Sequence, residues 1–295
     1  MPHGEVLTDA VRAFDAVRPR LFGIAYRMLG TVQDAEDTVQ DTWLRWQHAD
    51  RSAVRDATAF LVTTTTRLAL NAATSARARR ESYVGPWLPE PVQTSLDPAD
   101  RAEQGEAVGL ALLLLLQRLT PTERAVYVLR EAFDYSFRQI AEVLDITEAN
   151  ARQLGRRART HLAEERHMPV APADHGRLLH AFLGAARSGD LGRLEKLLVN
   201  DVVSYADSGG LVSAARVPVT GSANVARYLV GLVRKYGAGV SLDVVESNGQ
   251  EAVLVRRAGS AVALCAIDAS PEGIARVLII LNPAKLARFG PHAVL

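Results

Sequence analysis

Two short helical segments around a tight turn, from Tyr135 to Leu162, constrain the fold of this chain more than any other feature. The second segment has an apolar stripe and, opposite to it, a polar one: Ala151, Leu154, Ala158 and Leu162 against Arg152, Gln153, Arg156 and Arg159. Thr147 is expected to cap this second helix, which then begins at Glu148. Asp145, in the turn, is of a type that tolerates the left-handed backbone such turns need. The pattern predicts a helix-turn-helix that binds DNA, and the alternative is a plain helical hairpin with a solvated basic face.

Length and composition define the broad class of the protein. A chain of 295 residues, 48% of them hydrophobic, is long enough for two or three domains that each bury a core. No apolar run approaches the roughly 18 residues that span a bilayer, and the first residues lack the apolar segment of a signal peptide. We therefore expect a cytoplasmic protein with no membrane partner. The single cysteine, Cys265, excludes an internal disulfide and a cysteine-based zinc site, and we expect it in a buried strand.

Two breaks rich in proline divide the chain into three parts. Helical periodicity extends over residues 9–80 and again over residues 98–167. Between them, the run Gly85-Pro86-Trp87-Leu88-Pro89-Glu90-Pro91 cannot continue a helix. We expect it to form an extended linker with an aromatic anchor. Residues 168–172 form the second break.

From about Asp174 the pattern changes class. Two helices are expected first, and then five short runs rich in β-branched residues: Val202–Tyr205, Val240–Val245, Ala252–Arg257, Ala261–Ile267 and Val277–Leu281. Asn248-Gly249 predicts a hairpin between two of these runs, because both residues tolerate positive φ. A helix from Asn224 to Lys235, with Ser222 as its cap, interrupts the strands. The sequence therefore predicts an α+β unit with a curved antiparallel sheet.

The helix expected after Thr31 has one acidic side. Its apolar stripe consists of Val32, Ala35, Val39, Trp43 and Trp46, and its opposite side carries Asp34, Asp37 and Asp41, with Gln40 and Leu44 beside them. DNA would repel such a face, so a protein partner is one interpretation. A face that is merely solvated is the other.

The following helix is of the opposite character. Arg67 and Asn71 share one side of it at i, i+4 spacing, and a short basic tail follows with Arg77, Arg79 and Arg80, which suits phosphates. The four threonines at 63–66 are unusual in a helix, because β-branched side chains lose rotamer freedom there. Their hydroxyls either face DNA or form a buried or solvated patch.

Taken in order, these segments resemble bacterial sigma factors of the extracytoplasmic-function class. The resembling segments are Ala25–Trp46, Phe60–Arg80 and Leu119–Leu162. The motif at Trp87–Pro91 and the ending Asn282-Pro283-Ala284-Lys285-Leu286 are similar to a subgroup that carries a SnoaL-like domain of the NTF2-like fold. That subgroup typically has an Asp-Gly-Gly-Gly-Lys turn, whereas this chain has Asp207-Ser208-Gly209-Gly210-Leu211.

The resemblance implies a fold and its domains. Two all-α sigma domains, the second with the helix-turn-helix, would precede an α+β NTF2-like cone with a curved antiparallel sheet. Their expected ranges are 9–82 for sigma region 2, 83–105 for the linker, 106–167 for sigma region 4 and 174–290 for the SnoaL-like regulatory domain.

The resemblance also implies partners and contact residues. Core RNA polymerase would meet Asp37, Gln40, Asp41 and Leu44. The −10 element of promoter DNA would meet Arg67, Asn71, Arg77, Arg79 and Arg80, and the −35 element would meet Arg152, Gln153, Arg156 and Arg157. Interdomain regulation would involve Trp87, Leu88, Pro89, Pro91 and Asp207. No catalytic residue, metal or cofactor is expected, because the polymerase performs the chemistry, while an unknown small ligand or an anti-sigma protein stays open.

Two other functions compete at this point. A one-component transcription regulator with a small-molecule sensor would use the last two domains but would give the acidic helix no task. An enzyme built on the NTF2-like domain has His175, His180, Asp207 and Asp268 as candidates, although no spacing ties them into an acid–base pair. An enzyme would also leave the basic recognition helix unexplained.

Overall fold

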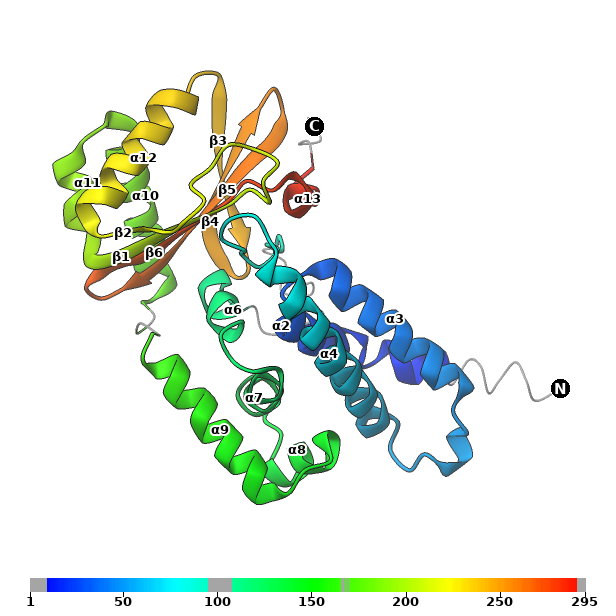
Figure 1. Cartoon of the computed structure of the whole chain (residues 1–295). Helices are drawn as coiled ribbons and strands as arrows, with labels where there is room; N and C mark the ends of the chain where they lie inside the picture. Colours follow the sequence, from blue (N-terminus) through cyan, green and yellow to red (C-terminus); the bar gives the residue numbers. More distant parts are fainter. Residues whose placement is uncertain (1–9, 95–107, 166–167, 169, 291–295) are drawn as a thin grey trace. The chain divides into compact units, whose positions relative to one another are not determined.

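The computed structural model describes residues 10–94, 108–165, 168 and 170–290 (Figure 1). These residues form two compact units. The first unit consists of residues 1–81, 96–108 and 113–165. The second unit consists of residues 82–95, 109–112 and the chain from 166 onward. The first part of the expected linker therefore belongs to the C-terminal unit, and residues 95–105 of that linker lie outside the described residues.

The first unit is helical, as the sequence predicts. Its elements are α2 (Arg18–Leu29), α3 (Val32–His48), the 3-10 turn η1 (Arg51–Ala53), α4 (Ala57–Glu81), α7 (Pro121–Tyr127), the π-helical turn η2 (Val128–Ala132), α8 (Phe137–Leu144) and α9 (Glu148–Ala163), together with the end of α6 (Leu110–Leu116). Gly30 ends α2 in the left-handed conformation, with φ of 76°. Thr31 then caps α3 by accepting a hydrogen bond from the Asp34 amide.

Part of the threonine run in α4 lies inside this unit. Thr65 and Thr66 are buried, and the Thr65 hydroxyl lies 3.0 Å from the hydroxyl of Thr42 in α3. The Thr64 hydroxyl donates to the carbonyl of Phe60 within the helix. Thr64 and Thr65 thus have partners within the helices, and Thr66 is buried, which favours the buried-patch interpretation over hydroxyls that face DNA.

The helix-turn-helix is confirmed in its details. Asp145 ends α8 with φ of 56°, and Thr147 caps α9 by accepting from the Asn150 amide. Ser136 forms a capping box with Gln139 at the start of α8, so both ends of the short helix have partners for their free backbone groups.

The second unit packs helices on one face of a six-stranded sheet (Figure 1). Its elements are α10 (Pro172–Ser188), α11 (Leu191–Leu197), β1 (Leu198–Asp207), β2 (Val219–Thr220), α12 (Ser222–Tyr236), β3 (Val240–Ser247), β4 (Gln250–Arg257), β5 (Ser260–Ser270), β6 (Gly273–Ile280) and α13 (Pro283–Leu286). Gly221, and not Ser222, occupies the cap position of α12. The five expected strands are confirmed, and the two-residue strand β2 is additional.

The strand order is β2-β1-β6-β5-β4-β3, and the sheet is mixed. All neighbouring strands are antiparallel except β1 and β6, which are parallel. The reason is topological: successive hairpins lead from the edge strand β3 back to β6, which then runs beside β1 in the same direction. The Asn248-Gly249 hairpin is confirmed, with φ of 54° and 75°. A second hairpin uses Ala258-Gly259 and was not expected, because alanine rarely adopts positive φ.

One face of the sheet carries the hydrophobic core of the second unit. Alternate residues of β4, β5 and β6, among them Val253, Ile267 and Val277, pack with Phe182 of α10 and Leu229 of α12 in one hydrophobic core. The expected strand residue Cys265 lies on this face, and burial raises the pKa of its thiol to about 12. Among the described residues, no helix is long and apolar enough to cross a membrane.

Candidate functional sites

The acidic side of α3 is open. Asp37, Gln40 and Asp41 are exposed, and the Leu44 side chain is 44% exposed. The opposite side packs into the first unit through Val39 and the other members of the apolar stripe. The four residues expected to meet core polymerase therefore share one accessible surface, while Asp37 accepts a hydrogen bond from Gln33.

The residues expected to meet the −10 element lie on α4, and some of them bind other parts of the first unit. Arg67 donates through Nε to the carbonyl of Val143 at 2.8 Å, and its Nη2 lies 3.5 Å from the carbonyl of Glu142, both in the last turn of α8. Asn71 and Arg77 are exposed, and the Arg77 guanidinium lies 4.0 Å from Glu81. The structure does not describe the Arg79 side chain.

Two arginines meet at the C-terminus of α2. Arg80 donates to the carbonyl of Leu29 and to Gln117, and Arg124 donates to the carbonyl of Met28 and to the same Gln117 oxygen. These carbonyls belong to the last turn of the helix, where no intrahelical donor exists and positive charge is favoured. Burial, with the neighbouring arginines, lowers the pKa of Arg124 to about 9. Arg80 is thus held inside the unit, and the role of Arg124 had no signal in the sequence beyond its charge.

The arginines of the recognition helix α9 fall into two groups. Arg157 lies 2.8 Å from the buried Glu123, and Arg159 donates through two atoms to Glu131. Arg152 pairs with Glu148 one turn earlier and lies over the ring of Phe137. Gln153 and Arg156 are exposed, and no hydrogen bond or ion pair of their side chains occurs within the described residues. Of the four residues expected at the −35 element, these two are the ones free to bind.

Glu123 connects the recognition helix to the start of α7. Its carboxylate accepts from the backbone amide and hydroxyl of Thr120, and Thr120 in turn caps α7. Burial alone would raise the pKa of Glu123, but the hydrogen bonds from Thr120 and the positive charge of Arg157 lower it. The Arg157 contact therefore fixes α9 against α7.

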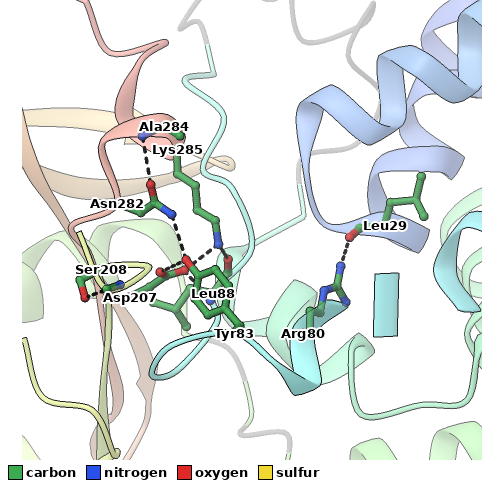
Figure 2. Close-up of polar contacts among 10 residues, drawn as sticks. Leu29, Arg80, Tyr83, Leu88, Asp207, Ser208, Asn282, Ala284 and Lys285 are labelled. Atoms are coloured by element: carbon green, nitrogen blue, oxygen red, sulfur yellow. Dashed lines mark hydrogen bonds and ion pairs between the residues drawn. The ribbon is translucent and has the colours of Figure 1, made fainter. Parts of the chain in front are cut away.

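In the second unit, the linker is bound by a cluster that we call the linker clamp: Tyr83, Trp87, Leu88, Asp207, Asn282 and Lys285. Figure 2 labels all of these residues except Trp87. Asp207, at the end of β1, is fully buried and accepts from the Tyr83 hydroxyl at 2.5 Å and from the Leu88 amide at 2.8 Å. Its carbonyl accepts from the amides of Leu281 and Asn282. Burial and Asp207 raise the pKa of the Tyr83 phenol, which therefore stays protonated and donates.

Lys285 of α13 provides the positive charge of the linker clamp. Its Nζ lies 2.6 Å from Asp207 Oδ2, donates to the Leu88 carbonyl, and lies 4.4 Å from the centre of the Trp87 ring. Asn282 Nδ2 donates to the Tyr83 hydroxyl at 2.9 Å. The ammonium thus has a carboxylate, a carbonyl and an aromatic face as partners, which a buried charge requires.

The next linker residues continue along the sheet. Leu88, Pro89 and Pro91 are buried. Val92 exchanges hydrogen bonds with Asn248, and the Thr94 amide donates to the carbonyl of Glu246 in the edge strand β3. Residues 83–94 are therefore bound to the C-terminal unit by side chains first and by backbone pairing afterwards.

Two glycines allow the linker to approach the turn after β1. Gly209 and Gly210 have φ of 59° and 76°, and a Cβ on Gly209 would lie 2.8 Å from Asn282 Nδ2 and 3.0 Å from the Tyr83 hydroxyl. Leu211, where the related subgroup has lysine, is 69% exposed. The departure from the subgroup's turn therefore leaves Asp207 in the linker clamp and both glycines beside the linker.

The candidate acid–base residues of the C-terminal unit serve other contacts. His175 Nε2 lies 3.2 Å from the carbonyl of Ile267, and His180 lies 3.9 Å from Glu251. Asp268 pairs with Arg276 at 2.5 Å, and Asp207 belongs to the linker clamp. No hydrogen bond or ion pair therefore joins any two of these four described residues in the structure.

Comparison with known proteins decides the family. Residues 13–79 match Sigma-70 region 2, and residues 109–162 match Sigma-70, region 4. The ECF RNA polymerase sigma factor SigJ of Mycobacterium tuberculosis is 40% identical over 235 residues, which cover 78% of this chain and 75% of that protein. This chain belongs to the extracytoplasmic-function sigma factors. The probable ECF RNA polymerase sigma factor SigI of the same organism is 34% identical over 93% of both chains.

A solved structure extends the similarity to the C-terminal unit. The crystal structure of the M. tuberculosis sigma factor SigJ superposes with a TM-score of 0.77 at 35% identity, over 94% of this chain and 98% of that one. Like its relatives, this sigma factor binds core RNA polymerase and promoter DNA and directs transcription initiation. Membership in this family also replaces the alternative function of a one-component transcription regulator, which gave the acidic face of α3 no role.

Proposed function

We propose that this sigma factor reads its promoter with two separate surfaces of the first unit. Asp37, Gln40, Asp41 and Leu44 dock on core polymerase; Arg67, Asn71, Arg77 and Arg79 bind near the −10 element; and α9 reads the −35 element. Arg80 was expected at the −10 element as well, but in this proposal it holds the end of α2. Residues 9–82 and 106–167 are the corresponding domains. Gln153 and Arg156 are exposed and have no side-chain partner among the residues that the structure describes. This supports base contacts from α9, since glutamine suits adenine and arginine suits guanine.

We further propose that the SnoaL-like domain, residues 174–290, modulates initiation through the linker. The observation that carries this proposal is Asp207, which holds linker and domain together by binding Tyr83, Leu88 and Lys285 at once. Residues 83–94 would span up to roughly 40 Å when extended. Binding them to the C-terminal domain removes that length from the connection between regions 2 and 4.

In this proposal the protein supplies no catalytic group, since core polymerase performs the chemistry, and it acts in the cytoplasm where promoter DNA is transcribed. The C-terminal domain regulates how far apart regions 2 and 4 can lie, because it binds the linker that connects them. Trp87 and the prolines suit this task, because a stiff, aromatic segment binds with little ordering entropy.

Reconstituted transcription tests both parts of the proposal. Core polymerase with the wild-type protein should initiate from a promoter with −10 and −35 elements, and absence of any specific transcript would overturn the promoter-reading proposal. Trp87→Ala, and a truncation before residue 174, should change the transcript yield, while Trp87→Phe should retain the wild-type yield because it keeps an aromatic face for Lys285. A yield that is unchanged in Trp87→Ala and in the truncation would overturn the regulatory role.

A further inference from the structure

The C-terminal unit contains a long segment with basic residues and no acidic ones. Between Asp207 and Asp243 the sequence has Arg216, Arg227, Arg234 and Lys235 but no aspartate or glutamate. Acidic residues otherwise occur about once in nine residues, 33 among 295. Soluble surfaces usually mix both signs of charge, so this single-sign segment needs a specific reason.

Three of these charges lie on the solvent side of α12. We call Arg227, Arg234 and Lys235 the basic ridge. The other side of the helix is buried and carries Val225 and Leu229, whereas the ridge residues are exposed. Arg227 and Arg234 are seven residues apart, which places them about two turns or 10 Å apart along one side of the helix. Within the described residues no carboxylate pairs with the ridge, and Arg227 donates only to Asn224.

The neighbouring helices show what an ordinary surface of this domain looks like. In α10, Arg177 pairs with Asp174, and at the start of α11 the Asp190 carboxylate accepts from the Arg193 amide. Glu195 adds a further negative charge on α11. Both signs of charge thus occur on α10 and on α11, and α12 alone among the three helices lacks a negative charge.

Two simpler explanations do not account for the basic ridge. Favourable interaction with the helix dipole explains Arg234 and Lys235, which lie in the last turn, but not Arg227 in the first half of α12. A protein interface would normally place a large apolar or aromatic anchor among the charges. Between Arg227 and Arg234 the exposed residue of α12 is Gly231, where a Cβ would meet nothing within 4 Å. The exposed aromatic Tyr236 lies beyond the ridge, and Lys235 Nζ covers its ring at 5.0 Å from the ring centre.

We propose that the basic ridge of α12 binds the phosphate backbone of duplex DNA without sequence preference. Arginine and lysine on a smooth surface are the usual groups for such contacts. The C-terminal domain would then give the sigma factor a third attachment to DNA, besides the two promoter-reading surfaces. This inference rests on the proposed action on promoter DNA, but not on which residues read the −10 and −35 elements.

The test compares two charge-matched variants of the full chain. The ridge variant is Arg227→Gln/Arg234→Gln/Lys235→Gln, and the control is Arg177→Gln/Arg187→Gln/Arg193→Gln on α10 and α11. Both lose three positive charges, and glutamine preserves helix propensity. Fluorescence anisotropy with a labelled duplex that lacks promoter elements measures the affinity over a series of salt concentrations.

We expect the ridge variant alone to bind more weakly, with a slope of log Kobs against log salt that is smaller by up to about 2.7, since each phosphate contact contributes about 0.9. Equal losses in both variants, or no loss in the ridge variant, would overturn the proposal. A ridge variant that keeps its DNA affinity but binds core polymerase more weakly would also overturn it, in favour of a protein partner. Promoter-specific initiation at saturating protein reports separately on the proposed promoter reading, and it should persist in both variants.

Discussion

Asp207 and Lys285 form a buried ion pair that the linker completes. The Lys285 Nζ lies 2.6 Å from Asp207 Oδ2, and the two side chains bind opposite polar groups of one residue: Asp207 the amide of Leu88, and Lys285 its carbonyl. Undocking the linker would remove the Leu88 hydrogen bonds of both charged groups and the Trp87 ring beside Lys285. The linker therefore contributes to the stability of the domain that binds it.

Replacing Asp207 with asparagine should release the linker. In the docked state the Lys285 side chain is only 9% exposed, so losing its carboxylate there breaks a buried pair, which costs about 3–5 kcal/mol and favours release of the linker. We expect faster hydrogen exchange of the Leu88 amide and lower thermal stability of the C-terminal unit. Asp268→Asn is the control, because Asp268 pairs with Arg276 on the same sheet without touching the linker clamp. Equal exchange of Leu88 in both variants would contradict the assigned role of Asp207.

A methyl group at Gly209 should weaken the contact between the linker residue Tyr83 and Asn282 of the C-terminal domain. Gly209→Ala places a Cβ 2.8 Å from Asn282 Nδ2 and 3.0 Å from the Tyr83 hydroxyl, at a φ of 59° that alanine tolerates poorly. We expect a destabilisation of about 2 kcal/mol or more, because the methyl group displaces the Tyr83 hydroxyl from Asn282.

Gly239→Ala separates the two causes of this destabilisation. Gly239 has φ of 70°, but its Cβ would meet nothing within 4 Å, so this variant has the backbone strain without the steric conflict. Gly239→Ala should destabilise the protein by only about 1 kcal/mol. Urea unfolding measures the stability of both variants, and hydrogen exchange of the Leu88 amide, which donates to Asp207, measures whether the linker stays docked. If both variants behave alike, backbone strain and not the linker contact explains the glycine.

The recognition helix offers a test that separates folding from base reading. Arg156→Ala should leave the free energy of unfolding within about 0.5 kcal/mol, because Arg156 has no partner within the described residues. It should relax discrimination at one base pair of the −35 element by about 1–3 kcal/mol. Binding to promoters with each base pair substituted in turn measures this effect.

Arg157→Ala should behave differently. Its guanidinium lies 2.8 Å from the buried Glu123, although half of the arginine side chain is exposed, so we expect a loss of stability of about 1 kcal/mol. Affinity should then fall similarly for all −35 variants. A base-specific loss in Arg157→Ala, with unchanged stability, would make Arg157 a base-reading residue.

How far the sequence predicts this molecule depends on the kind of interaction. Many caps, turns and strands follow from local rules, and those at Thr147, Asp145 and Asn248-Gly249 were predicted. The cap at Gly221 and the Ala258-Gly259 hairpin were not, because Ser222 is the more usual cap and alanine rarely adopts positive φ. The parallel pairing of β1 with β6 depends on how distant strands meet, and no local pattern specifies it. Trp87, Leu88 and Asp207 could be proposed from the family resemblance, but their common contact with Lys285 joins residues almost 200 positions apart.

The same limit applies to the arginines. Residue type and helical spacing place Arg67, Arg152 and Arg157 on polar faces, and sequence reasoning then treats them alike. Only the fold shows that Arg157 faces a buried glutamate and that Arg67 donates to the end of α8. A charge on a helix face predicts a polar neighbour, but the neighbour's identity depends on tertiary packing.

Glu123 should make the helix-turn-helix region sensitive to acid. Burial acts to raise the pKa of this carboxyl, but the hydrogen bonds from Thr120 and the charge of Arg157 outweigh burial and hold the pKa below its ordinary value of 4.5. A carboxyl with a lowered pKa in the folded state contributes stability above its unfolded pKa, and this contribution is lost as the pH falls through the folded pKa. The protection factors of the amides in α7 and α9, which compare exchange with that of the unfolded chain at the same pH, should therefore fall below about pH 4.5. Glu123→Gln keeps a capping group at this position but cannot titrate, so its protection factors should be lower at neutral pH and change less on acidification. An acid response of equal size in the wild type and in Glu123→Gln would assign the sensitivity to other carboxylates.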